Sequence, residues 1–77
     1  MRIQVLGTGC AKCKALAANA EQAVRELGLD AQVEKVEDPR EIARFGVMLT
    51  PALALDGKVK GVGKVLTAKA IKELLAT

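Results

Sequence analysis

Apolar and polar residues alternate at the start of the chain and then recur at helical spacing. Residues 2–6 predict a β-strand, which ends at a loop that begins with Gly7. Between residues 11 and 27 apolar side chains recur every three or four positions, which predicts a helix with one buried face. That face consists of Leu16, Ala20, Val24 and Leu27. Gly28 follows directly and is typical of a helix end.

The middle of the chain contains a second strand and a short helix. Residues 31–36 alternate imperfectly and predict a strand. Asp38 and Pro39 are typical of a helix start, because a carboxylate accepts backbone N–H groups there and proline fits the first turn. The pattern predicts that this helix ends at Gly46.

Two further strands and a last helix complete the pattern. Residues 52–55 and 58–62 predict strands, and the pair Asp56-Gly57 between them favours a two-residue hairpin turn. Thr67 can accept the first N–H groups of a final helix. The predicted order is β-α-β-α-β-β-α, which indicates a single α/β domain over residues 1–77.

Composition limits what the core of this domain contains. A chain of 77 residues buries only about 60% of its unfolded surface. Phe45 is the one aromatic residue, so the core must be built from Val, Leu, Ile and Ala. We interpret Phe45 as a core residue and Met48 as a buried filler, since methionine adapts to irregular gaps.

Charge is unevenly distributed, although the net charge is only +3. Residues 21–56 are acidic, and residues 57–77 are basic, with five lysines and one glutamate. These lysines could attract an acidic partner, or they could simply be solvated edge and helix positions. No aromatic residues for base stacking accompany them, so we expect no nucleic-acid partner.

The hydrophobic pattern also bears on location. No apolar run approaches the ~20 residues of a membrane span, and residues 3–6 are too short for the core of a signal peptide. We therefore expect a cytoplasmic protein without a membrane partner. In a reducing compartment, two closely spaced cysteines are more often catalytic, redox-sensing or metal-binding than structural.

Cys10 and Cys13 form a C-x-x-C pair between the first strand and the first helix. A helix start presents unpaired N–H groups and the positive end of the helix dipole, which stabilise a thiolate. Lys12 and Lys14 add positive charge nearby. Because both cysteines lie in one turn, their sulfurs can meet, and the pattern predicts a reversible dithiol/disulfide centre.

Together, the order of elements, the C-x-x-C and the Thr50-Pro51 pair before the third strand resemble the thioredoxin fold. Over essentially its whole length the chain resembles the small thioredoxin- or glutaredoxin-like redox-active disulfide proteins. Residues 7–13, 46–53 and 56–59 carry the most specific part of this resemblance. It implies a minimal thioredoxin fold, with a mixed four-stranded sheet and three helices, and a thiol–disulfide oxidoreductase that needs no bound cofactor.

The resemblance also implies roles for individual residues. Cys10 attacks a disulfide substrate, which is a protein or a small molecule, and Cys13 resolves the mixed disulfide. The Thr50-Pro51 bond is cis, and the Thr50 backbone pairs with an extended substrate. We expect Thr50, Pro51, Gly9, Ala11 and Lys12 to form the substrate-binding surface. Electrons come from a thioredoxin-reductase-type donor, and the protein is expected to be a monomer.

Two other interpretations of the cysteine pair stay open at this point. The two thiolates could bind a soft metal or metalloid, such as Cu(I) or arsenite. They cannot complete a tetrahedral zinc site by themselves, and the chain contains no histidine. Alternatively, the pair could be structural or vestigial.

Overall fold

The computed structural model describes residues 1–76 of the chain. Seven elements follow one another, in the order that the hydrophobic pattern predicts. They are β1 (Arg2–Leu6), α1 (Ala11–Leu27), β2 (Gln32–Val36), α2 (Pro39–Arg44), β3 (Ala52–Leu55), β4 (Lys58–Val62) and α3 (Ala68–Leu75). The structure confirms the predicted α/β architecture.

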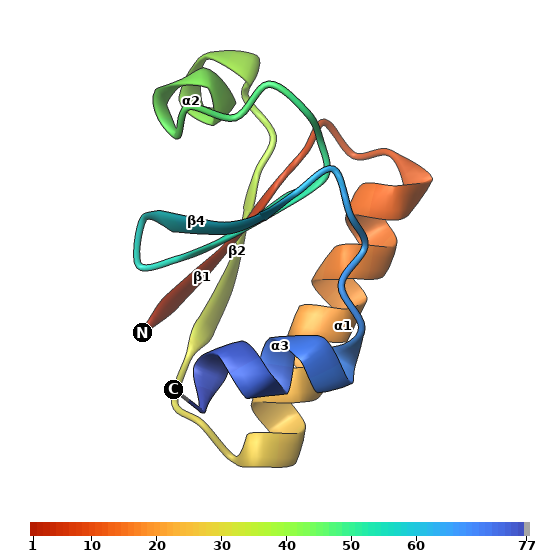
Figure 1. Cartoon of the computed structure of the whole chain (residues 1–77), viewed down its shortest axis with the longest axis vertical. Helices are drawn as coiled ribbons and strands as arrows, with labels where there is room; N and C mark the ends of the chain where they lie inside the picture. Colours follow the sequence, from red (N-terminus) through yellow and green to blue (C-terminus); the bar gives the residue numbers. More distant parts are fainter. Residues whose placement is uncertain (77) are drawn as a thin grey trace.

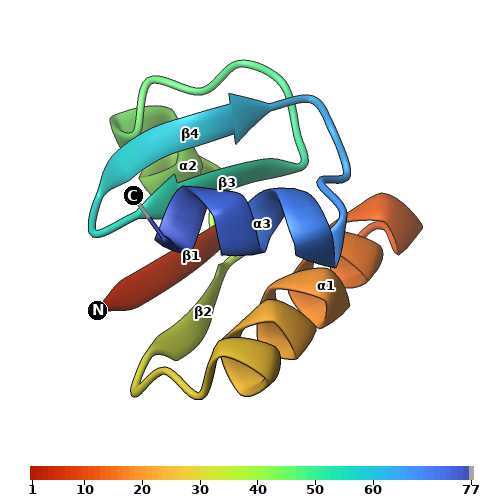
Figure 2. The same ribbon diagram turned by 60° about the horizontal axis from the view of Figure 1, so that its bottom comes forward.

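The four strands form one mixed sheet in the order β2-β1-β3-β4. Strand β1 pairs in parallel with β2, while β1 with β3 and β3 with β4 are antiparallel. Helices α1 and α3 lie together on one side of this sheet, and α2 lies on the other (Figures 1 and 2). This arrangement is the minimal thioredoxin fold that the sequence resemblance implies.

The main core lies between the sheet and the α1–α3 layer. It is built from aliphatic side chains and alanines, as the composition requires. Its buried members are Ile3, Val5, Leu16, Ala17, Ala20, Ala23, Leu53, Leu55, Ile71 and Leu75. Small side chains such as Ala17 and Ala20 let α1 approach the sheet closely.

A second, smaller cluster lies under α2 on the other side of the sheet. Leu6, Ile42, Val47 and Ala52 are buried there, and Phe45 packs against them while remaining half-buried. The only aromatic residue therefore covers the edge of a small core rather than filling the main one.

One detail of the predicted helix face is wrong. Leu27 is 40% exposed, and Ala23 is fully buried instead. The buried residues of α1 are Cys13, Leu16, Ala17, Ala20 and Ala23. The buried face of α1 is therefore rotated away from the predicted face that contains Val24 and Leu27. Alanines belong to the buried face because the helix lies close to the sheet there.

The hairpin turn at Asp56-Gly57 has the conformation that this residue pair favours. Both residues have positive φ, 49° for Asp56 and 86° for Gly57, as a type I′ turn requires. The Gly57 N–H donates to the side-chain oxygen of the buried Gln4 over 3.1 Å. An Asp56 carboxylate oxygen accepts from the Arg2 N–H over 2.7 Å. The turn is thereby fixed to β1.

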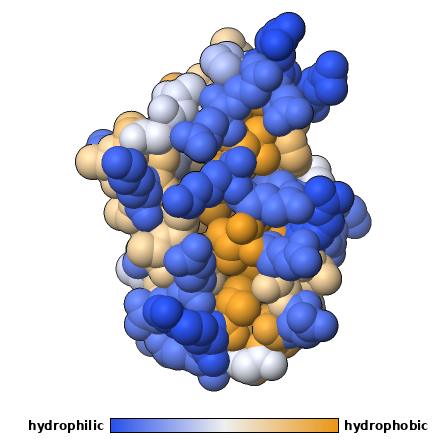
Figure 3. All heavy atoms as spheres, turned by 180° about the vertical axis from the view of Figure 1, so that it is seen from behind, coloured by the Kyte–Doolittle hydropathy of each residue, from blue (hydrophilic) through white to orange (hydrophobic). Residues whose placement is uncertain are grey.

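The few helices and strands of the molecule leave part of its hydrophobic surface uncovered. Seen from behind, hydrophobic surface is exposed as a stripe between hydrophilic side chains (Figure 3). Such incomplete covering is expected for a domain of this size. No helix among residues 1–76 is both long enough and apolar enough to span a bilayer.

Two polar contacts connect α1 to the last part of the chain. The Asn19 side-chain amide donates to the Leu66 carbonyl over 2.8 Å. The Lys72 ammonium group lies 2.6 Å from a Glu26 carboxylate oxygen. This hydrogen bond from Lys72, together with one from Gln22 and the positive charge of Lys72, lowers the pKa of Glu26.

We predict that replacing Lys72 by Met removes a pH-dependent part of the stability. A lowered carboxyl pKa contributes stability above the ordinary value of 4.5, and that contribution disappears as the pH falls through the lowered pKa. The difference in urea unfolding free energy between wild type and Lys72→Met should thus be largest at neutral pH and disappear in acid, where Glu26 is protonated in both proteins. Lys69→Met is the control, and its difference from wild type should not change with pH. A pH-independent effect of Lys72→Met would contradict the prediction.

Candidate active site

Four strand ends meet in one row at the same end of the sheet. Val36, Leu6, Ala52 and Val62 lie side by side across β2, β1, β3 and β4. The chain continues from this row into the segments that the sequence singles out. The Gly7 N–H donates to the Val36 carbonyl over 3.0 Å, and the Gly63 N–H donates to the Pro51 carbonyl over 2.8 Å. The sheet therefore brings the C-x-x-C loop close to the segment between α2 and β3 that ends at Pro51. This segment is called the proline loop below.

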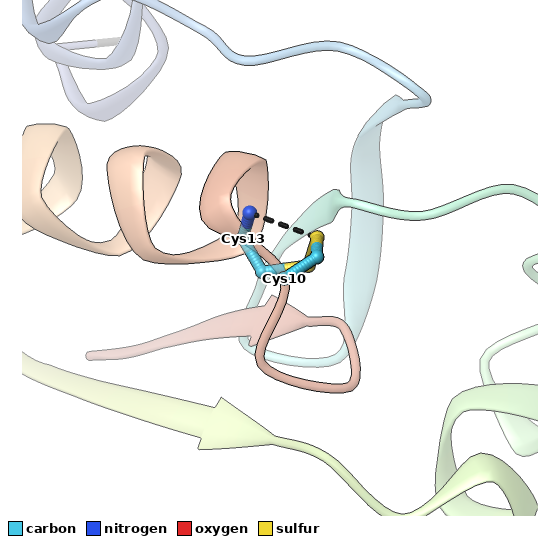
Figure 4. Close-up of a disulfide and its surroundings, with 2 residues drawn as sticks. All are labelled: Cys10 and Cys13. Atoms are coloured by element: carbon cyan, nitrogen blue, oxygen red, sulfur yellow. Dashed lines mark hydrogen bonds between the residues drawn. A yellow bond between two sulfur atoms is a disulfide. The ribbon is translucent and has the colours of Figure 1, made fainter.

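Cys10 and Cys13 are joined by a disulfide at the start of α1 (Figure 4). Their Cα atoms are 5.0 Å apart. Cys10 is the N-cap of α1, with extended backbone angles, and Cys13 lies in the first turn. The spacing predicted that both sulfurs could meet in one turn, and the helix start brings them together in this way.

The sulfur of Cys10 takes the place of an ordinary capping oxygen. The Cys13 backbone N–H donates to Cys10 Sγ over 3.2 Å (Figure 4). The first helical bond of the backbone, from the Lys14 N–H to the Cys10 carbonyl, measures 3.0 Å. A free N–H at a helix start is a donor that stabilises negative charge. When the disulfide is reduced, this donor points at the position of a Cys10 thiolate.

The two sulfurs differ sharply in their exposure. Cys10 is exposed, whereas Cys13 retains only 5% of its accessible surface. A disulfide or thiol reagent can thus approach the centre from the side of Cys10. The buried Cys13 faces the interior of the loop.

Gly7 makes the burial of Cys13 possible. A Cβ atom built on Gly7 would overlap the Cys13 sulfur and lie 4.0 Å from Pro51 Cα. The absent side chain therefore leaves the space in which the buried sulfur sits. The sequence alone does not reveal this contact between Gly7 and the Cys13 sulfur.

Pro51 closes the other side of this contact. Its side chain is fully buried, and the Thr50–Pro51 peptide bond is cis. Thr50 is exposed, and within residues 1–76 neither its N–H nor its carbonyl has a hydrogen-bond partner. Of the other expected surface residues, Ala11 and Lys12 are exposed at the helix start and Gly9 is half-buried.

A small cavity beside Cys13 was not foreseen from the sequence. It has a volume of about 70 Å³, and charged residues of α1 and β2 border it. Its lining consists of Val5, Gly7, Gly9, Cys13, Lys14, Lys35 and Glu37. Lys35 and Glu37 reach the site because β2 runs parallel to β1, a pairing that their sequence positions alone do not reveal. A larger cavity, about 500 Å³, lies elsewhere, and no cysteine lines it.

Met48 differs from its predicted role. It is 95% exposed, not buried, while its neighbour Val47 is buried. The segment between α2 and Pro51 has no regular secondary structure, so helical or strand periodicity gives no guide to which side chains turn inward.

Among the described residues no group of three His, Cys, Asp or Glu side chains is placed to hold a metal ion. Both sulfurs are engaged with each other rather than presented as a pair of thiolate ligands. The disulfide therefore favours the redox interpretation over the soft-metal one.

A disulfide across the first turn of a helix, beside a proline loop in a mixed sheet, defines a thioredoxin-fold thiol–disulfide oxidoreductase. Comparison with known proteins agrees, because a thioredoxin-domain family model matches residues 1–76. A thioredoxin from Methanothermobacter thermautotrophicus is 45% identical over 76 residues, which cover 99% of each chain. A thioredoxin from Methanocaldococcus jannaschii is 44% identical over 73 residues, 95% of this chain and 84% of that protein.

The chain thus belongs to the thioredoxin family, and its activity is thiol–disulfide oxidoreduction through the Cys10–Cys13 disulfide.

We predict that replacing Gly7 by Ala displaces Cys13. The added methyl group occupies the position of the sulfur, so the free energy of unfolding should fall by about 1–3 kcal/mol, as for other overpacked sites. In the reduced protein, Cys13 should also react faster with iodoacetamide, as measured by peptide mapping. Gly28→Ala is the control, because its Cβ would meet no atom within 4 Å although its positive φ still costs stability. Unchanged labelling of Cys13 in Gly7→Ala would contradict the packing argument.

Proposed function

We propose that Cys10 is the attacking nucleophile and Cys13 the resolving cysteine. The observation that carries this assignment is the Cys13 N–H directed at Cys10 Sγ, at an exposed helix start. This donor and the helix dipole favour a thiolate on Cys10 rather than on Cys13. Exposure supports the same order, since a substrate disulfide can reach Cys10 while Cys13 is buried.

The reaction then proceeds in two exchanges. The Cys10 thiolate attacks one sulfur of the substrate disulfide, which releases the other sulfur as a thiolate and leaves a mixed disulfide. The Cys13 thiol loses its proton and attacks Cys10 Sγ, which releases the second substrate sulfur. The substrate gains two electrons and two protons, and the Cys10–Cys13 disulfide forms.

The proline loop supplies the surface on which an extended substrate docks. The Thr50 N–H and carbonyl are without partners in residues 1–76, so they are available to a peptide strand. Pro51 lies beside Gly7 and the Cys13 sulfur, which puts such a strand next to the disulfide. Gly9, Ala11 and Lys12 complete this surface on the side of α1.

The remaining assignments rest on the family and on the sequence. The substrates are disulfide-containing proteins or small molecules, and a thioredoxin-reductase-type donor returns the protein to the dithiol state. The single thioredoxin-like domain over residues 1–77 acts as a monomer in the cytoplasm. The thioredoxins to which the chain is similar over nearly its whole length support these assignments.

We predict that Cys10 of the reduced protein is alkylated faster than Cys13 at neutral pH. The reason is that Cys10 is exposed and its sulfur accepts the helix-start N–H, whereas Cys13 is buried. The measurement is time-resolved iodoacetamide labelling with peptide mapping. The same labelling in concentrated urea is the control, because unfolding removes both effects and should bring the two rates close together. Faster labelling of Cys13 in the folded protein would reverse the assigned roles.

We further predict that Cys13→Ser traps a mixed disulfide with substrate through Cys10. Without Cys13, no thiol remains in this chain to expel the bound substrate. Cys10→Ser should trap little, because its remaining thiol is buried. Non-reducing electrophoresis after incubation with an oxidised protein substrate, followed by mass spectrometry of the adduct, distinguishes the variants. Equal trapping by both variants would show that Cys10 is not the specific nucleophile.

A further inference from the structure

Exposed apolar side chains gather around the proline loop. Four of the seven large hydrophobic residues that are exposed in the described chain lie in residues 48–49 and 62–65. They are Met48 (95% exposed), Leu49 (64%), Val62 (40%) and Val65 (37%). These two segments flank the hydrogen bond between the Gly63 N–H and the Pro51 carbonyl. A Cβ built on Gly63 would lie 3.6 Å from Leu49, so the segments are in contact.

Lysines surround the same end of the sheet. Lys12 and Lys14 lie at the start of α1, Lys35 is paired with Val5 near the end of β2, and Lys64 follows Gly63. These four residues are called the lysine rim below. None of them takes part in an ion pair within residues 1–76. Within the C-x-x-C loop and the segments that leave β2 and β4, Glu37 is the one carboxylate without an ion pair.

At the opposite end of the sheet, which carries the hairpin turn, some charged residues are bonded to one another. There Arg2 forms an ion pair with Glu34 at 2.9 Å, and Asp56 accepts from the Arg2 N–H. Arg2 and Asp56 are therefore bonded within the chain at one end, whereas the lysine rim at the other end has no ion-pair partner among residues 1–76. Unpaired lysines next to an apolar surface are complementary to a partner that carries acidic residues beside apolar ones.

We propose that the preferred substrate is an extended protein segment in which apolar residues flank the reactive cysteine and acidic residues lie just outside them. This inference rests on the proposed docking at Thr50 and on the proposed nucleophile Cys10. The apolar residues contact Met48 and Leu49, and the acidic residues lie near the lysine rim. At physiological salt the field of each lysine extends about 8 Å, which reaches a segment docked beside the disulfide.

Two peptides of identical length test this preference. Each has a central cysteine in a mixed disulfide with thionitrobenzoate and a leucine on either side of it. One peptide has glutamates at the outer positions, and the other has lysines there. An excess of the reduced protein reduces each peptide and releases the coloured thionitrobenzoate, which gives the second-order rate constant directly. At low salt we expect the acidic peptide to react about tenfold faster, within the range of electrostatic steering, and this ratio should approach one as salt screens the charges.

Charge-reversed variants locate the effect on the protein. Lys64→Glu should lower the ratio of acidic to basic peptide severalfold, because Lys64 adjoins the Pro51–Gly63 contact. Lys58→Glu is the matched control, with the same change of net charge on an exposed lysine at the other end of β4. Lys58→Glu should leave the ratio unchanged. Equal rates for the two peptides, a ratio that salt does not reduce, or equal effects of the two variants would overturn the proposal.

The apolar part of the preference has a test of its own. Replacing the leucines of the acidic peptide by serines should lower its second-order rate constant, and Met48→Ser should reduce the difference between the leucine and serine peptides. An unchanged difference would exclude Met48 from the docking surface. Reduction of hydroxyethyl disulfide, a small uncharged substrate, distinguishes failure of the proposed substrate preference from failure of the redox assignment. If this reduction proceeds through Cys10 while the peptides show no preference, the substrate class is wrong and the redox assignment stands.

Discussion

The structure depends on how one helix begins. Cys10 caps α1 with its sulfur, and the Cys13 N–H donates to that sulfur. This contact fixes the helix start, brings the two sulfurs within bonding reach and directs a hydrogen-bond donor at the exposed one. Since a helix start always has unpaired N–H groups, the protein uses a structural requirement of the fold to stabilise a reactive sulfur. The capping residue and the proposed nucleophile are therefore the same side chain.

The remaining elements position this helix start. Strand β1, paired on both sides, ends directly before the loop, and its last residue lies in the row formed by Val36, Leu6, Ala52 and Val62. Gly7, next in the chain, has no side chain where the Cys13 sulfur lies, and Pro51 approaches from β3. The sheet thus delivers three separate segments to one point. The space left by Gly7 lets the Cys13 sulfur be buried while Cys10 remains exposed.

The two ends of the sheet serve different purposes. At the end of the sheet that carries the hairpin turn, hydrogen bonds within the chain engage Gln4, Arg2 and Asp56. At the end of the sheet that lies beside the disulfide, the Thr50 backbone lacks partners in residues 1–76 and Met48 is almost fully exposed. A domain of this size has little stability to spare, so contacts left unmade at one end indicate a surface that a partner completes. The stabilising contacts of the fold lie within the four-stranded sheet and between the sheet and the α1–α3 layer.

The sequence by itself determined the order of elements, because strand alternation, helix spacing and capping residues such as Asp38 and Thr67 are local signals. The redox chemistry was equally local, since the C-x-x-C pair lies within one helical turn. What lay beyond the sequence were contacts between distant segments. The register of β1 with β2 brings Lys35 and Glu37 beside Cys13, the irregular loop before Pro51 turns Met48 outward, and close packing on the sheet selects Ala23 over Leu27 for burial. Local patterns reflect the backbone preferences of neighbouring residues, whereas these contacts depend on how separate elements pack, and only the tertiary structure decides that.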